Sequence, residues 1–116
     1  MVVDELTDAE IDSIFQALAD ATRRDIVRRV MLDELSVSRL ARDYSMSFAA
    51  VQKHVAVLER AALVVKQRHG REQLVHGSAD RLHQAARLLD AYADLWAQRA
   101  DRIAELLASD TKGQRS

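Results

Sequence analysis

Hydrophobic residues recur at helical spacing along most of this 116-residue chain, with one short β-type stretch between residues 63 and 76. Apolar positions three and four residues apart predict helices with one buried face. They predict four helices before residue 63, and a candidate N-cap residue precedes each one: Thr7, Asp20, Ser36 and Ser47. We expect the buried faces to be, in order, Ile11, Ile14, Phe15 and Leu18; Ile26, Val27, Val30 and Met31; Val37, Leu40 and Ala41; and Val51, Val55, Leu58 and Ala62.

The β-type stretch predicts a hairpin. Residues 63–68 and 72–76 are short runs rich in β-forming side chains, and His69-Gly70-Arg71 lies between them. Gly70 supplies the positive φ that a tight hairpin turn requires. The sequence therefore predicts two antiparallel strands in an otherwise helical protein.

A long last helix is expected after Ser78, ending at about Ser109. It carries apolar residues seven apart, a spacing typical of a helix that packs against a partner helix. These residues are Leu82, Leu89, Trp96 and Ile103. We expect residues 1–109 to form one domain and residues 110–116 to be a flexible tail.

Composition excludes several classes of function. The absence of cysteine excludes disulfide scaffolds, thiolate zinc sites and thiol nucleophiles. No apolar run reaches the ~18 residues of a membrane span, and the N-terminus is acidic, unlike a signal peptide. No motif places a phosphate loop or a catalytic triad. We therefore expect a cytoplasmic protein without a membrane partner, a cofactor or an enzymatic activity.

The net charge of −1 conceals an uneven distribution. Residues 1–20 contain six acidic residues and no basic ones, residues 21–76 contain eleven basic and six acidic residues, and residues 77–116 contain six of each. The middle part is the one that can attract an anionic partner.

The order of short helices and a basic hairpin is typical of a winged helix-turn-helix domain, mainly α with one β-hairpin. Residues 43–46 have a suitable length for the turn between the third and fourth helices. The N-terminal turns of such a fourth helix can enter the DNA major groove, where the helix dipole favours phosphate. The sequence thus predicts double-stranded DNA as a partner.

Residues of the fourth helix and the hairpin are the candidates for DNA contact. Gln52 can bond an adenine edge, and Lys53 can reach guanine or phosphate. Phe48 and Ala49 would pack on the groove, although Phe48 could equally seal the helix against the core. The candidate phosphate ligands are Ser47, Lys66, Arg68 and Arg71.

Three other residues have open roles. His54 lies near the border of the core face, where it could bond to backbone atoms or face DNA. Arg23 and Arg24 could hold a phosphate at the start of the second helix, or pair with the acidic first segment.

Three segments resemble the ArsR-type winged-helix repressors. Residues 15–24 (FQALADATRR) are similar to the family's "ALADPTRR" segment, and residues 34–41 (ELSVSRLA) to its "ELSVGELA" helix. Residues 46–58 (MSFAAVQKHVAVL) are similar to its recognition helix, "MSQPAVSKHLKVL". The resemblance covers roughly residues 12–107.

This resemblance implies a homodimeric repressor, joined through residues 5–18 and 79–107, on a palindromic operator. The expected interface residues are Ile11, Ile14, Phe15, Leu82, Leu89, Trp96 and Ile103. Trp96 could instead line an effector pocket, and no effector is identified.

The chain departs from the family pattern at several positions. Ala21 and Ala49 stand where the family often has proline, and Tyr44 where it often has glycine. Phe48 and Gln52 replace the usual Gln and Ser of the reading helix, so the operator sequence of relatives does not transfer.

The metal sites of the family are not matched. Ser36 and Ser38 occupy the cysteine positions of the third helix, and His83 is the one histidine after the hairpin. We therefore predict no metal. Asp80, His83, Arg87, Asp90 and Asp94 form a polar stripe that we interpret as a solvated ion-pair face. The alternatives are a repressor with an unrecognised metal site and a winged helix that binds an acidic protein.

Overall fold

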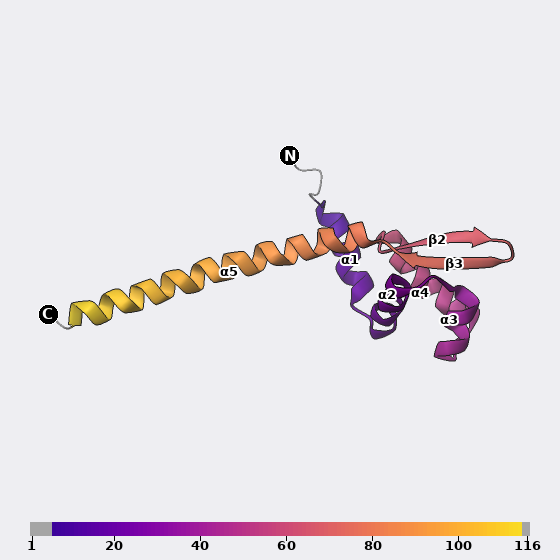
Figure 1. Ribbon diagram of the computed structural model, residues 1–116, viewed down its shortest axis with the longest axis horizontal. Coiled ribbons are helices and arrows are strands. Elements are labelled where there is room, and N and C mark those ends of the chain that lie inside the picture. Colours follow the sequence, from indigo (N-terminus) through magenta and orange to yellow (C-terminus); the bar gives the residue numbers. More distant parts are fainter. Residues whose placement is uncertain (1–5, 115–116) are drawn as a thin grey trace. The chain divides into compact units, whose positions relative to one another are not determined.

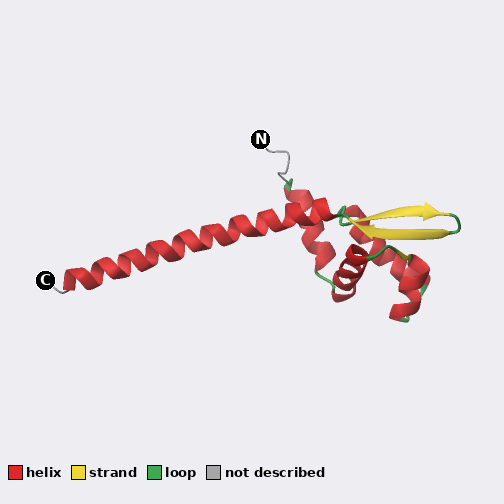
Figure 2. Ribbon diagram, in the orientation of Figure 1, coloured by secondary structure: helices red, strands yellow, loops and turns green. Residues whose placement is uncertain are grey.

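The computed structural model describes the backbone of residues 6–114 and the side chains of residues 6–110. Its internal contacts divide the chain into two compact units, Met1–Ala85 and Ala86–Ser116. The first unit contains seven elements and the first residues of an eighth, and Figures 1 and 2 show the helices and strands. In chain order these are α1 (Asp8–Leu18), α2 (Ala21–Leu32), β1 (Leu35–Ser36), α3 (Val37–Tyr44), α4 (Phe48–Arg60), β2 (Val64–His69), β3 (Glu72–Gly77) and α5 (Ala79–Gln114).

The predicted N-caps are confirmed at the first four helices. Thr7 and Glu10 form the full capping box of α1, in which each side chain accepts a hydrogen bond from the other residue's backbone N–H. Asp20, Ser36 and Ser47 each accept a backbone N–H in the first turn of α2, α3 and α4. These bonds satisfy N–H groups that a helix leaves without a partner, so they determine where each helix begins.

The predicted core faces of α2, α3 and α4 pack together with α1 and the sheet, except that Met31 of α2 is exposed; Phe15, predicted on the buried face of α1, is exposed too. The buried apolar residues are Ile14, Ala17, Ile26, Val27, Val30, Val37, Leu40, Val51, Val55, Leu58, Ala61, Leu63, Val64, Val75 and Ala85. Ala62 is an exception to the prediction, because it follows the end of α4 rather than lying on its inner face. It has a φ of 60°, and its N–H and that of Leu63 bond to the carbonyls of Glu59 and Leu58, which is a Schellman helix end.

The sheet contains one strand more than the sequence predicted. Its order is β1-β3-β2, with Leu35 opposite Val75 and Ser36 opposite Leu74. A two-residue strand has no alternating pattern to detect, which explains why the sequence analysis missed β1. The predicted hairpin of β2 and β3 is confirmed, with His69 opposite Glu72 and Gly70 at a φ of 63°.

The second unit is the continuation of α5. Every described side chain from Ala91 to Asp110 is exposed. The helix continues to Gln114, so residues 110–114 are helical where the sequence predicted the start of a tail. Gly113 is the single strong helix-breaking residue in that segment, which explains the longer helix. None of the described helices has the length and apolar composition of a membrane span.

Candidate nucleic-acid interface

Helices α3 and α4 form the helix-turn-helix. Ser45 ends α3 in the left-handed conformation, with a φ of 54°. Its N–H bonds to Arg42 and that of Met46 to Ala41, which closes the turn. Ser45 is therefore the position in this turn where glycine would relieve backbone strain.

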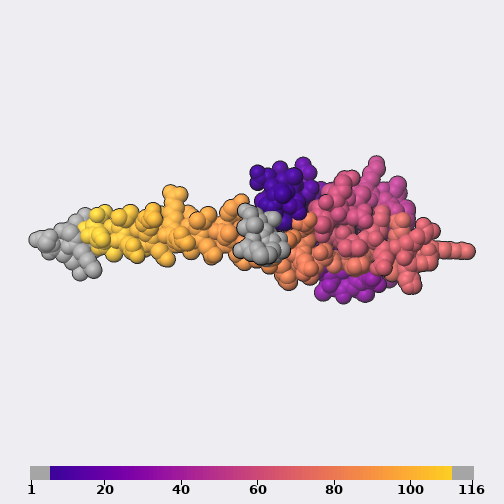
Figure 3. Space-filling model, turned by 90° about the horizontal axis from the view of Figure 1, so that it is seen from above, coloured from indigo at the N-terminus to yellow at the C-terminus, as the bar shows by residue number. Residues whose placement is uncertain are grey.

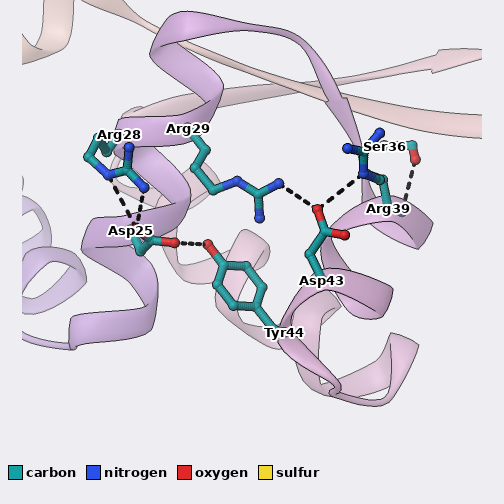
Figure 4. Close-up of polar contacts among 7 residues, drawn as sticks. All are labelled: Asp25, Arg28, Arg29, Ser36, Arg39, Asp43 and Tyr44. Atoms are coloured by element: carbon teal, nitrogen blue, oxygen red, sulfur yellow. Dashed lines mark hydrogen bonds and ion pairs between the residues drawn. The ribbon is translucent and has the colours of Figure 1, made fainter.

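A network of charged side chains attaches α3 to α2 (Figure 4). Asp43 accepts hydrogen bonds from Arg29 at 2.6 Å and from Arg39 at 3.1 Å. The Tyr44 hydroxyl donates to Asp25, and the guanidinium of Arg29 lies 5.4 Å from the centre of the Tyr44 ring. The hydrogen bond from Arg29 lowers the pKa of Asp43, so the carboxylate stays charged at neutral pH. The network fixes the helix-turn-helix against the rest of the first unit.

The outer face of α4 is exposed at the predicted contact residues. Ala49 and Lys53 are exposed, and Phe48 retains 48% of its surface. The exposure of Phe48 favours a surface position over a seal against the core. Ser47 Oγ accepts the N–H of Ala50 at 3.1 Å, which leaves the hydroxyl proton available for an acceptor such as phosphate.

The wing is the hairpin of β2 and β3, and its turn projects from the first unit (Figures 1 and 3). Arg68 and Arg71 are exposed near the turn, and Lys66 is half-buried closer to α4. Arg68 Nε donates to the carbonyl of Gly70 at 3.3 Å. The wing thus presents positive charge on a chain segment separate from α4.

Gln52 connects the two segments. Its Nε2 donates to Gln73 Oε1 on β3 at 2.7 Å, and its Oε1 lies 3.5 Å from Lys66 Nζ on β2. Gln52 was predicted from the sequence as a base-reading residue, whereas Gln73 was not singled out. Gln73 stands opposite Arg68 and therefore on the same sheet face as Lys66, but its contact with Gln52 depends on how α4 packs against the wing.

The three residues whose roles the sequence left open, Arg23, Arg24 and His54, each contact other groups of the first unit. Arg23 donates to the carbonyls of Ala17 and Gln16 at 2.8 and 3.0 Å, and Arg24 donates to that of Leu18 at 2.7 Å. Both arginines therefore bond carbonyl oxygens at the C-terminal end of α1.

His54 also has side-chain neighbours instead of the backbone bond that we considered. Its Nδ1 lies 3.5 Å from Arg23 Nη1 and 3.9 Å from Asp20 Oδ2. The backbone hydrogen bond from Arg23 lowers the pKa of Asp20, so this carboxylate is charged beside His54. The group is half-buried and joins α4 to the start of α2.

The predicted interface residues fall into three sets. Ile14 is 1% exposed within a single chain, so nearly all of its surface is already covered by the core. Ile11, Phe15 and Leu82 remain partly exposed in the first unit. In the second unit the heptad residues are exposed: Leu89 by 51%, Trp96 by 65% and Ile103 by 43%. Residue 5, at the edge of the predicted first segment, lies outside the described residues.

The start of α5 is joined to α1 within the first unit. Arg81 Nη1 donates to Glu10 Oε2 at 3.0 Å. Hydrogen bonds from the Thr7 backbone and from Arg81 lower the pKa of Glu10, which keeps the pair ionised. Among the described residues, no group of three or more His, Cys, Asp or Glu is placed to hold a metal ion.

Known proteins with similar sequences and structures are DNA-binding regulators. No protein-family model matches the chain. The HTH-type transcriptional regulator Rv2034 of Mycobacterium tuberculosis is 51% identical over 53 residues, which span 46% of this chain and half the length of that protein.

Two solved structures extend the comparison. An ArsR-like transcriptional regulator from Rhodococcus sp. RHA1 is 32% identical, covers 87% of this chain and 93% of its own, and superposes with a TM-score of 0.79. A possible ArsR-family regulator, Mb0332 from Mycobacterium bovis, is described as a homodimeric winged helix-turn-helix DNA-binding domain. It is 20% identical over 77% of this chain and 88% of its own, with a TM-score of 0.61, and this likeness shows the fold alone. On the identity and coverage of the Rhodococcus protein, the chain belongs to the ArsR family of winged helix-turn-helix transcriptional regulators, which are DNA-binding proteins and not enzymes.

Proposed function

We propose that this protein is a homodimeric transcriptional repressor that acts in the cytoplasm on a palindromic operator, without the usual metal-sensing sites of its family. The observation that carries the proposal is the pairing of two exposed surfaces on the first unit. The first turns of α4 present Phe48, Ala49 and Lys53, and the wing presents Arg68 and Arg71. A protein that only bound an acidic protein partner would need the basic hairpin alone. The exposed N-terminal turns of α4 beside that hairpin are of the kind that enters the DNA major groove.

The two surfaces would divide the work of DNA binding. Gln52 and Lys53 would contact base edges in the major groove, with Phe48 and Ala49 against the groove wall. Ser47, Lys66, Arg68 and Arg71 would hold the phosphate backbone, which supplies affinity without sequence preference. A repressor bound in this way would exclude the polymerase from the promoter.

Dimerisation supports the same function. The heptad residues Leu89, Trp96 and Ile103 form an exposed apolar row on α5, and such a row is stabilised when a second helix covers it. A two-fold dimer would place two copies of α4 in major grooves about one helical turn apart, or a multiple of it. An operator with dyad symmetry follows from that geometry.

The salt dependence of DNA binding tests the proposed surface. Lys53→Ala and Arg68→Ala should each weaken binding to the chain's own promoter DNA, and each should reduce the slope of log affinity against log salt by about one. The measurement is a fluorescence-anisotropy titration at several salt concentrations. Arg60→Ala is the matched control, because it removes the same charge at the far end of α4.

Each alternative predicts a different result. Wild-type affinity and slope in both variants would reject the proposed contacts. A wild-type protein with no preference for any promoter fragment over random DNA would favour the protein-docking alternative. DNA release on titration with zinc or nickel would favour a metal-responsive repressor.

A further inference from the structure

A chain of three polar side chains links the wing to the reading helix. Lys66 Nζ faces Gln52 Oε1 at 3.5 Å, and Gln52 Nε2 donates to Gln73 Oε1 at 2.7 Å. Lysine can only donate hydrogen bonds, so the oxygen of Gln52 must face Lys66 and its NH2 group must face Gln73. The contact with Lys66 thus determines the orientation of the Gln52 amide, and Gln73 closes the other side.

The three side chains lie where the wing changes from apolar to polar. Val64 and Val75 are buried on the sheet face that packs toward α4, and Lys66 and Gln73 follow on the same face toward the turn. All three members of the polar chain are half-buried. Restricted access of water strengthens such hydrogen bonds and limits the rotamers of Gln52.

Gln52 retains the capacity to bind a base while these contacts persist. A side-chain amide can accept two hydrogen bonds and donate two, and Gln52 uses one of each within the chain. One acceptor site and one N–H remain, which is the pair that a bidentate contact with adenine requires. Holding the amide in advance spares the entropy of ordering it when DNA binds.

From this geometry we infer that Gln73 is a positioning residue for base recognition: through its hydrogen bond it orients the amide of Gln52, so that sequence reading by α4 depends on a residue of the wing. The inference rests on the proposed DNA-binding function. It assigns a role in specificity to β3, a strand for which the sequence predicted no functional residue.

The ratio of two affinities tests this role. The probes are a duplex selected by the wild-type protein from a randomised library, and the same duplex with its sequence shuffled. Gln73→Met keeps the length of the side chain but removes the acceptor, and it should lower the selected-to-shuffled affinity ratio roughly three- to tenfold, the range that one hydrogen bond supplies. Affinity for the shuffled duplex should stay at the wild-type level, because no charge changes.

Two further variants separate positioning from a general structural effect. Gln73→Glu retains an acceptor for Gln52, so its affinity ratio should be that of the wild type, even though the added charge weakens binding to both duplexes. Gln67→Met is the matched control, since Gln67 is exposed and lies on the other face of β2. In a double-mutant cycle, Gln73→Met should add nothing to the effect of Gln52→Met.

The outcomes distinguish this inference from the proposed function. A wild-type protein that binds both duplexes equally would reject both. A normal wild-type ratio that Gln73→Met leaves unchanged would reject the positioning role and leave the proposed function intact. An equal loss of ratio in Gln67→Met would show that any change in the wing has this effect, and would also reject it.

Discussion

At the scale of single residues, the backbone at the end of α4 is strained at a position where glycine would relieve the strain. Ala62 has a φ of 60°, a left-handed conformation that costs an L-residue about 1 kcal/mol. Ala62→Gly should therefore raise the free energy of unfolding by about 0.5–1 kcal/mol. Thermal unfolding followed by circular dichroism should show an increase of a few degrees.

The preceding residue provides the control for this prediction. Ala61 has ordinary right-handed angles, with a φ of −79°, and is buried. Ala61→Gly should lower the melting temperature, because glycine there gains no relief of strain and the unfolded chain gains entropy. A loss of stability in both variants would contradict the strain argument at Ala62.

Residue identities predicted the contact surface only in part. Lys53, Arg68 and Arg71 are exposed as expected, because charged side chains seldom find partners in a small core. Gln73 and the carbonyl partners of Arg23 were not predictable, since both contacts depend on how separate elements meet. Helical periodicity likewise placed Ala62 on a helix face, because a helix that ends without glycine carries no visible stop signal.

At the scale of elements, helices with a cap residue and a one-sided apolar face were predictable from the sequence. The short strand β1 and the end of α5 were not. The N-caps Thr7, Asp20, Ser36 and Ser47 all begin helices in the structure. Strand β1 consists of two residues and forms through its pairing with β3, which no local pattern reveals. The end of α5 was also misplaced, because polar residues are compatible with both a helix and a tail.

The apolar row on α5 leads to a prediction about assembly. Trp96→Glu places a charge in the row and should convert a dimer into monomers, because burying an unpaired carboxylate costs more than the apolar contact gains. Sedimentation equilibrium measures the change in mass. Gln98→Glu is the matched control, since Gln98 is exposed and lies about 200° around the helix from Trp96, on the opposite side.

Dissociation by the control variant, or a stable dimer of Trp96→Glu, would contradict the assignment of this row to the interface. Both variants introduce glutamate, which has a good helix propensity. A difference between them therefore reports on the face of the helix and not on the stability of α5.

At the scale of the whole molecule, the uneven charge explains how a protein of net charge −1 binds DNA. Basic residues are in excess in residues 21–76, which contain α4 and the wing, whereas residues 1–20 are acidic. Opposed charge on one chain lowers attraction to DNA in general and leaves close contacts to determine where the protein binds. The near-neutral net charge then favours selective binding of DNA over non-specific binding, and it is not evidence against a nucleic-acid partner.

Neutralising the acidic segment tests this explanation. Asp8 and Asp12 lie on α1, and Asp4 and Glu5 precede the described residues. Changing all four to the corresponding amides should raise affinity for random-sequence DNA at low salt, and the gain should fall as added salt screens the charges. The same changes at Asp90, Asp94, Asp101 and Glu105 of α5 provide a control of equal charge. If the acidic segment limits non-specific binding because of its position, affinity for random DNA should rise more in the first variant than in the control. Equal gains in affinity would mean that net charge alone sets the non-specific affinity. No gain in either variant would reject the electrostatic argument.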